Sequence, residues 1–134
     1  MKYFFYEKEI KSLLMSSVDK RVRYFIHKVA DWEYLYLSYD KKRGLDTIYD
    51  SLNRKGVCVW PFKEFADVYY EDDDIMKEKV KKMSIHKFLN EYIKDLSQLN
   101  INIFIFPVQN KDCACMPAEK FKLYMEEELE KYIP

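Results

Sequence analysis

The chain has 134 residues, a formal net charge of zero from 23 basic and 23 acidic side chains, and an apolar fraction of 49%. This length is typical of a single domain, and the apolar content is sufficient for one hydrophobic core. Only 2 glycines argue against a glycine-rich phosphate loop, and the balanced charge argues against a nucleic-acid binder, which usually has a basic excess.

The cysteines and the N-terminus indicate a cellular compartment. Cys58, Cys113 and Cys115 are an odd number of thiols, which is typical of a reducing cytoplasm and not of a disulfide scaffold. The apolar run at 3–6 is too short for the core of a signal peptide, and no stretch approaches the length of a membrane span. We therefore expect a cytoplasmic protein with no membrane partner.

Apolar spacing in the first part of the chain predicts two amphipathic helices. Residues 7–17 have apolar side chains on one face, and a second helix, capped by Asp19, follows. The apolar stripe of the second helix consists of Val22, Phe25, Ile26 and Val29. Its opposite face is basic, with Lys20, Arg21, Arg23 and Lys28. We interpret this basic face as a solvated surface.

The next segment predicts three short strands joined by turns. Alternating side chains predict a strand at 33–39, and Gly44 can supply the positive φ of the turn that follows. A weak strand at 45–49 and a second turn lead to the buried, β-branched strand 57–60. Because the connections have hairpin length, we expect the three strands to pair as an antiparallel meander.

The stretch 57–70 predicts a strand-to-helix corner with Trp60 at its hinge. Pro61 ends the strand because it has no N–H for the sheet ladder, and its fixed φ suits the start of a helix. The helix that follows turns an apolar stripe toward the sheet, formed by Phe62, Phe65, Ala66 and Tyr69. We predict that Trp60 is a structural residue of the core.

The remainder predicts a surface excursion followed by helix, strand, strand and helix. Residues 71–82 are acidic and then basic, and we interpret them as exposed. Ser84 caps an amphipathic helix of about four turns, and the strand 101–106 is apolar on both faces and therefore central. A short return strand follows at 113–116. The last helix starts at Pro117 and directs toward the body Phe121, Tyr124, Met125, Leu129 and Tyr132.

These elements predict one α+β domain over residues 1–134. The expected architecture is an antiparallel sheet of about five strands with helices packed on it and the N-terminal helices first. No internal repeat, low-complexity tract or linker interrupts this pattern.

Four stretches together resemble a small bacterial family of unknown function, the one numbered 2750. They are RYFIHKVADWEYLYLSYD from Arg23, VWPFKEFA from Val59, SIHKFLNEYIKDLSQLNINIFIFP from Ser84 and MPAEKFKLYMEEEL from Met116. The resemblance covers roughly residues 19–132, and it implies a fold type and a bacterial cytoplasmic setting but no activity. The chain departs from the family pattern at Tyr36, where a second tryptophan is expected, and at 45–55, which puts the second strand in doubt.

No cluster in the sequence indicates a cofactor, a metal or a catalytic residue. Cys113 and Cys115 are one close pair, and with Cys58 they fall short of the four ligands of structural zinc. His27 and His86 lie in expected helices without the signature of a nucleophile and its base. We therefore predict that the cysteines are small apolar residues and that the protein has no cofactor, no metal and no enzymatic activity.

The two tryptophans suggest a candidate ligand pocket. Trp32 precedes the first strand and Trp60 ends the third, so we expect the two rings near each other, with Asp31, Lys63 and Glu64 beside them. Two indoles with an acid and a base would form a small-molecule pocket. In the alternative interpretation, both rings are core anchors and the charges stabilise helix ends.

The acidic run after the corner helix is a second candidate site, formed by Tyr70, Glu71, Asp72, Asp73 and Asp74. Tyr70 lies off the apolar stripe, so we expect it to be exposed. Acidic residues at a helix C-terminus interact unfavourably with the helix dipole, which hints at a role in binding. A tyrosine beside negative charge suits a basic partner protein. The alternative is a solubilising loop.

These features predict a cytoplasmic, non-enzymatic protein-interaction domain, either a toxin-neutralising immunity protein, by analogy, or an adaptor. The first alternative is a small-molecule sensor or enzyme that uses a pocket near Trp32 and Trp60. The second alternative is nucleic-acid binding through the face from Arg21 to Lys28, which a salt-dependent mobility shift would test. Zero net charge also leaves a homodimer open, because self-repulsion is weak.

Overall fold

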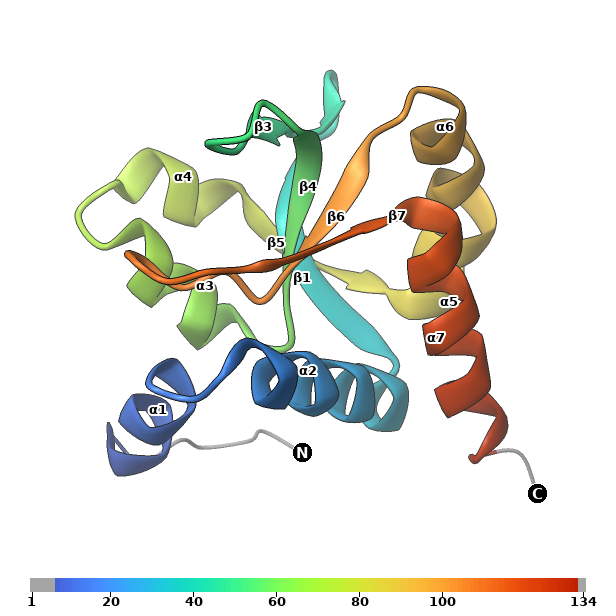
Figure 1. The fold of residues 1–134 in the computed structure, drawn as a ribbon. Coiled ribbons are helices and arrows are strands. Elements are labelled where there is room, and N and C mark those ends of the chain that lie inside the picture. The colour runs from blue at the N-terminus through green and yellow to red at the C-terminus, as the bar shows by residue number, and fades with distance from the viewer. Residues whose placement is uncertain (1–6, 133–134) are drawn as a thin grey trace.

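The computed structural model describes residues 7–132 and confirms an α+β fold with the N-terminal helices first (Figure 1). The apolar run at 3–6 lies outside the described residues. The helices are α1 (Glu7–Leu14), α2 (Val18–Trp32), α3 (Lys63–Tyr70), α4 (Asp74–Lys79), α5 (Ile85–Lys87), the π-helical turn η1 (Phe88–Tyr92), α6 (Ile93–Gln98) and α7 (Ala118–Glu130). The strands are β1 (Tyr34–Asp40), β2 (Gly44–Leu45), β3 (Ile48–Tyr49), β4 (Lys55–Trp60), β5 (Val80–Ser84), β6 (Asn102–Ile105) and β7 (Ala114–Pro117).

The strands form one mixed, mostly antiparallel sheet in the order β2-β1-β4-β6-β7, with β3 paired to β4 and β5 paired to β1. Only the β4–β6 pair among these is parallel. The chain between these two strands crosses over through α3 to α6, which is the kind of long connection that a parallel pair requires. In Figure 1, α3 and α4 lie to the left of the strands, α6 and α7 to the right, and α1 and α2 below.

The predicted three-strand meander is wrong in one respect, because β1 and β4 pair directly. Tyr36 pairs with Trp60 and Leu37 with Val59. The segment expected as one middle strand is divided into β2, on β1, and β3, on β4. Asp46 lies at the break, where its backbone N–H donates to the Ser38 carbonyl at 3.1 Å and its carboxylate accepts from the Ser38 hydroxyl at 2.5 Å. Gly44 has the expected positive φ, 83°.

Strand β5 was not expected, since 71–82 was interpreted as a surface excursion. It pairs with β1 along five residues, from Tyr34–Ser84 to Ser38–Val80. Only Val80 and Met83 of this strand are buried, while Lys81 and Lys82 are exposed. The charged side chains interrupt the alternation of apolar and polar residues by which a strand is predicted. On an edge strand they also protect the edge from pairing with other chains.

The helix ends follow capping chemistry, with one correction. The cap of α2 is Ser17, whose hydroxyl accepts from the Lys20 N–H at 3.2 Å, and not Asp19, which lies in the first turn. Ser84 caps the helical run α5–η1–α6 as expected, accepting from the Lys87 N–H at 3.4 Å. The π-helical turn in the middle of this run was not predicted, because the apolar spacing is helical on either side of it.

The core lies around β4 and β6, where the predicted corner is confirmed. Trp60 is fully buried, β4 ends at this residue, and Pro61 and Phe62 lead into α3. β6 lies between β4 and β7, so its predicted central place is also confirmed. In α7, the buried side chains are Ala118, Phe121 and Met125, whereas Tyr124 and Tyr132 were expected to face the body but are exposed. No helix within residues 7–132 is both long and apolar enough to cross a bilayer.

Candidate functional site

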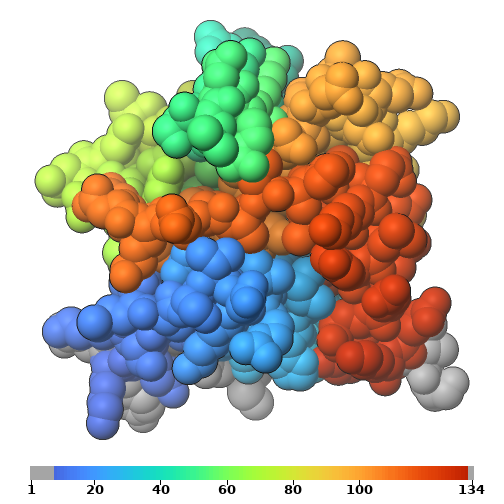
Figure 2. Space-filling view, viewed as in Figure 1, coloured from blue at the N-terminus to red at the C-terminus, as the bar shows by residue number. Residues whose placement is uncertain are grey.

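A cleft of about 510 Å³ opens where three segments of the chain meet. The name 'the cleft' is kept for this cavity. One wall comes from β3 and Asp50, a second from Tyr69 and Tyr70 at the end of α3, and a third from the connection between β6 and β7. Figure 2 shows this last connection (orange) as a strip on the surface below the β3–β4 turn (green). The segment 107–112, called the 107–112 loop, supplies most of this third wall.

Two buried side chains fasten the 107–112 loop at its two ends. The Trp60 Nε1–H donates to the carbonyl of Pro107 at 3.1 Å. The guanidinium of Arg21, which is 2% exposed, donates to the carbonyl of Asp112 and, at 2.6 Å, to that of Ser16. Because buried polar groups with good hydrogen bonds fix a unique geometry, the loop is held as a preformed wall.

Backbone conformations near the cleft are unusual. Phe106, fully buried beside Pro107, has φ 53°, which is a genuine outlier for a bulky residue. It is held there by its N–H, which donates to the Val59 carbonyl at 2.8 Å. Asn110 in the loop has φ 61°, and Glu71 after α3 has φ 44° with ψ −102°. Strained residues of this kind cluster at functional sites in proteins.

Tyr69 and Tyr70 form an aromatic group with Trp60 behind them. The Trp60 ring lies 5.5 Å from Tyr69 and 5.6 Å from Tyr70, and the two tyrosine rings are 5.1 Å apart at 81°. Burial raises the pKa of both phenols, so they are neutral hydrogen-bonding groups at physiological pH. The Gln109 amide donates to the Tyr69 carbonyl, which joins the loop to α3. Tyr70 is therefore half-buried and not exposed as predicted, because its ring packs over Trp60.

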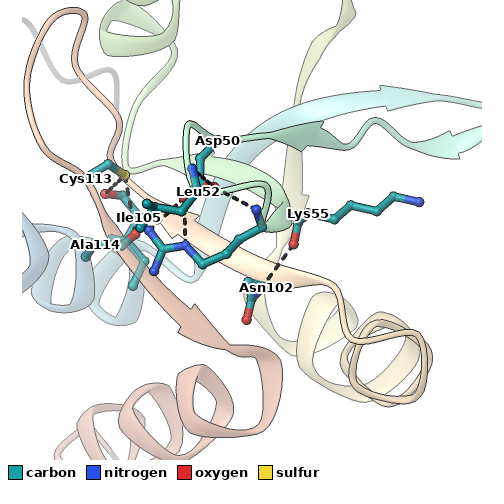
Figure 3. Close-up of polar contacts among 8 residues, drawn as sticks. Asp50, Leu52, Lys55, Asn102, Ile105, Cys113 and Ala114 are labelled. Carbon is teal, nitrogen blue, oxygen red and sulfur yellow. Dashed lines mark hydrogen bonds and ion pairs between the residues drawn. The ribbon is translucent and has the colours of Figure 1, made fainter.

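Two thiols, Cys58 and Cys113, line the cleft. Burial raises the pKa of Cys58 and raises that of Cys113 to about 12. The Cys113 Sγ donates at 3.4 Å to the carbonyls of Ile105 and Ala114 (Figure 3). Both thiols are therefore protonated and are poor nucleophiles. Within residues 7–132, no group of three or more His, Cys, Asp or Glu side chains is arranged to hold a metal ion.

Asp50, at the edge of the cleft, organises the β3–β4 turn. Its carboxylate accepts from the backbone N–H of Arg54 at 2.7 Å and of Leu52 at 3.1 Å, and from the Arg54 side chain at 2.8 Å (Figure 3). The Arg54 backbone N–H, more than any other group, holds the pKa of Asp50 below its ordinary value. These bonds fix the turn that carries Tyr49, an exposed aromatic residue at the cleft.

None of the five residues predicted to form a ligand pocket around the two tryptophans lines the cleft. Trp60 is fully buried, and the half-buried Trp32 packs edge-on against Phe62 at 5.9 Å. The Lys63 Nζ pairs with the Asp67 carboxylate at 2.8 Å. Asp31 and Glu64 are exposed. Trp60 instead supports the cleft from behind, through Tyr69, Tyr70 and Pro107.

The acidic run borders the cleft, and Asp73 lines it together with Tyr70. All four acidic residues, Glu71, Asp72, Asp73 and Asp74, are exposed. Asp73 caps α4, accepting from the Met76 N–H at 3.1 Å, and Asp74 is in the first turn of that helix. The expectation that the run opposes the dipole at the end of α3 is therefore incomplete, because Asp73 and Asp74 lie favourably at the start of α4.

The basic face of α2 is smaller than predicted. Arg21 belongs to the interior, which leaves Lys20, Arg23 and Lys28 with the acidic Asp19 on the same helix. The spacing of Arg21, Phe25 and Val29 by four residues is the signal that could have placed Arg21 on the buried stripe. No comparable sequence pattern predicts the cleft, because its walls come from segments that are far apart in the chain.

Residues 22–125 match the family described as "Protein of unknown function (DUF2750)". The chain belongs to the DUF2750 family. The matched range contains the residues that form the cleft of this DUF2750 protein, together with most of α2 and the greater part of α7. Searches of curated proteins and of solved structures found no match.

Proposed function

We propose that this DUF2750 protein is a non-enzymatic, cytoplasmic interaction domain that binds a segment of a partner protein in the cleft. The observation that carries the proposal is the pair Tyr69 and Tyr70, held on Trp60 and faced by a loop fastened at both ends. Tyrosines supply large contact areas at low entropic cost, and a preformed site loses little freedom on binding.

The preferred partner segment is basic. Asp73 at the cleft and its exposed neighbours Glu71, Asp72 and Asp74 make the rim negative, although Lys111 also lines the cleft. A negative rim accelerates encounter with a positive segment, and an ammonium or guanidinium group has tyrosine faces to contact. An immunity protein that neutralises a basic toxin and an adaptor that holds a basic tail both fit this chemistry.

The test uses a peptide array of graded net charge, followed by calorimetry on the strongest binder. Tyr70→Ala should weaken binding more than about tenfold, as expected for a buried aromatic contact. Tyr34→Ala is the matched control, because Tyr34 is a 41% exposed tyrosine on β1 that does not line the cleft. Equal affinity of wild type and Tyr70→Ala, with folding unchanged, would contradict the proposal.

A small-molecule sensor is the second candidate, because the cleft volume of about 510 Å³ lies within the usual range of ligand sites. A thermal-shift screen against metabolites separates the two functions. A stabilising metabolite whose effect disappears in Tyr70→Ala would favour the sensor. Peptide binding without any metabolite hit would favour the interaction domain.

A further inference from the structure

A second concave surface, of about 820 Å³, lies between α2 and α7, and we call it the α2–α7 groove. Its floor is formed by Ala114 and Met116 of β7. Along one side run Val18, Val22 and Ile26, spaced by four residues so that they share one face of α2. This groove is separate from the cleft, and none of its lining residues lines the cleft.

The strand at the floor, β7, is an edge strand without lysines, unlike the edge strand β5. β7 pairs with β6 alone among the described strands and ends the sheet. Its sequence, Ala-Cys-Met-Pro, carries no charge, whereas β5 exposes Lys81 and Lys82. Pro117 and the short length of β7 limit further pairing at this edge, but the uncharged side chains of β7 beside the apolar stripe of α2 form a surface suited to contact with another chain.

The charges around the groove balance one another. Its lining includes the basic residues Arg23, Lys120 and Lys131 and the acidic residues Asp19, Glu127 and Glu128. An interface with two-fold symmetry requires a surface complementary to itself, and a rim that carries both signs of charge meets this requirement. The formal net charge of zero adds no long-range repulsion between copies.

We propose that a second copy of this chain docks on the α2–α7 groove, so that the protein is a homodimer with two-fold symmetry. The dimer contact extends over the outer face of α7, where Leu123 is 61% exposed and Tyr124 is 42% exposed. It covers the apolar stripe of α2 and the uncharged end of the sheet, and it leaves the cleft free. The proposal does not depend on the function of the cleft.

The first experiment measures the mass in solution by analytical ultracentrifugation, from about 1 μM to 1 mM, the range of weak to moderate association. A concentration-dependent dimer is expected. Ile26→Glu should weaken dimerisation more than about tenfold, because a carboxylate would be buried in an apolar contact. Leu99→Glu is the control, since Leu99 is 69% exposed and does not line the groove. A monomer over the whole range, or an Ile26→Glu dimer as strong as the wild type, would overturn the proposal.

A charge exchange distinguishes lost contact from lost folding. Arg23→Glu with Lys120→Glu makes the rim acidic, and Asp19→Lys with Glu127→Lys makes it basic. Each double variant alone should be monomeric, with the circular dichroism spectrum of the wild type. Mixed in equal amounts, the two should restore a dimer that contains one copy of each. Failure of the mixture to associate, while each variant is folded, would contradict a self-complementary rim.

Discussion

At the scale of single residues, Trp60 and Arg21 have the same structural role. Each is buried, and each donates to a backbone carbonyl at one end of the 107–112 loop. The importance of Trp60 follows from the sequence, since an apolar strand ends there at a proline. The hydrogen-bond partner of Trp60, the carbonyl of Pro107, does not follow from the sequence. Pro107 lies far along the chain and reaches Trp60 only through the parallel pairing of β4 and β6.

Trp60→Ala should destabilise the protein by about 3–5 kcal/mol, as is usual for removal of a buried aromatic ring. Trp60→Phe keeps most of the packing and removes the Nε1–H, so it should cost less and should loosen the loop. Urea unfolding measures both free energies. A loss of under about 1 kcal/mol for Trp60→Ala, below the usual core range, would mean that the ring does not support the cleft.

Arg21→Met should destabilise the protein by about 1–3 kcal/mol, because it removes the charged, partly buried hydrogen bonds from the guanidinium to the carbonyls of Ser16 and Asp112. Hydrogen exchange should accelerate in the 107–112 loop more than elsewhere. Lys20→Met is the control, since it removes an exposed positive charge one residue away. Unchanged exchange in the loop would show that Arg21 does not fasten it.

The raised pKa of the Cys113 thiol predicts that the free energy of unfolding decreases at alkaline pH. The pKa of Cys113 is about 12 in the folded protein, well above that of an ordinary thiol. Below about pH 8.5 the thiol is protonated in both states and contributes no pH dependence. Above that pH the unfolded chain releases the proton and the folded chain keeps it, so the free energy of unfolding decreases until the folded pKa is reached.

Urea unfolding of wild type and Cys113→Ser between pH 8 and pH 11 checks this prediction, the range following from the ordinary and shifted thiol pKa values. The wild type should lose more stability than Cys113→Ser over the range, because serine does not titrate there. Parallel curves for the two proteins would contradict the raised pKa of Cys113.

At the scale of elements, apolar periodicity predicted the helices and strands whose apolar residues are regularly spaced. It missed a strand with charged side chains and the pairing between strands that are distant in the sequence. α2, β4, β6 and α7 were predicted because apolar spacing or an apolar run marks them. β5 was missed because Lys81 and Lys82 interrupt the pattern, and the direct β1–β4 pairing was missed because turn lengths do not determine which strands become neighbours. The position of the cleft depends on the pairing of β3 and of β6 with β4 and on the β6–β7 connection. The sequence therefore identified Tyr70 and Asp73 but not their surroundings.

The lysines of β5 should act as edge protection. Lys81→Ile with Lys82→Ile raises the β-propensity and the apolar surface of an outer strand, so it should increase aggregation during refolding while the native fold remains. Light scattering after dilution from urea measures the effect. The control is Lys87→Ile with Lys94→Ile on the helical run α5–α6, which adds the same apolar side chains without a sheet edge and outside the α2–α7 groove. Equal scattering for the two double variants would argue against a protective role.

At the scale of the whole molecule, the β6–β7 segment separates two surfaces of different chemistry. Its 107–112 loop faces the cleft, which has tyrosines, neutral thiols and an acidic rim. Its strand β7 faces the α2–α7 groove, which is apolar with a balanced rim. We propose that the first binds a basic segment of a partner and that the second binds another copy, so that a dimer presents two clefts.

The most direct test of the central claim is an amide NMR titration of the wild-type protein with short lysine- and arginine-rich peptides, compared with acidic peptides of equal length. We predict that the basic peptides shift amide signals of Tyr69, Tyr70 and Asp73 and of residues 109–111, and that the acidic peptides leave these signals unchanged. Signals at the cleft that do not move with the basic peptides, or that move equally with the acidic ones, would contradict the account.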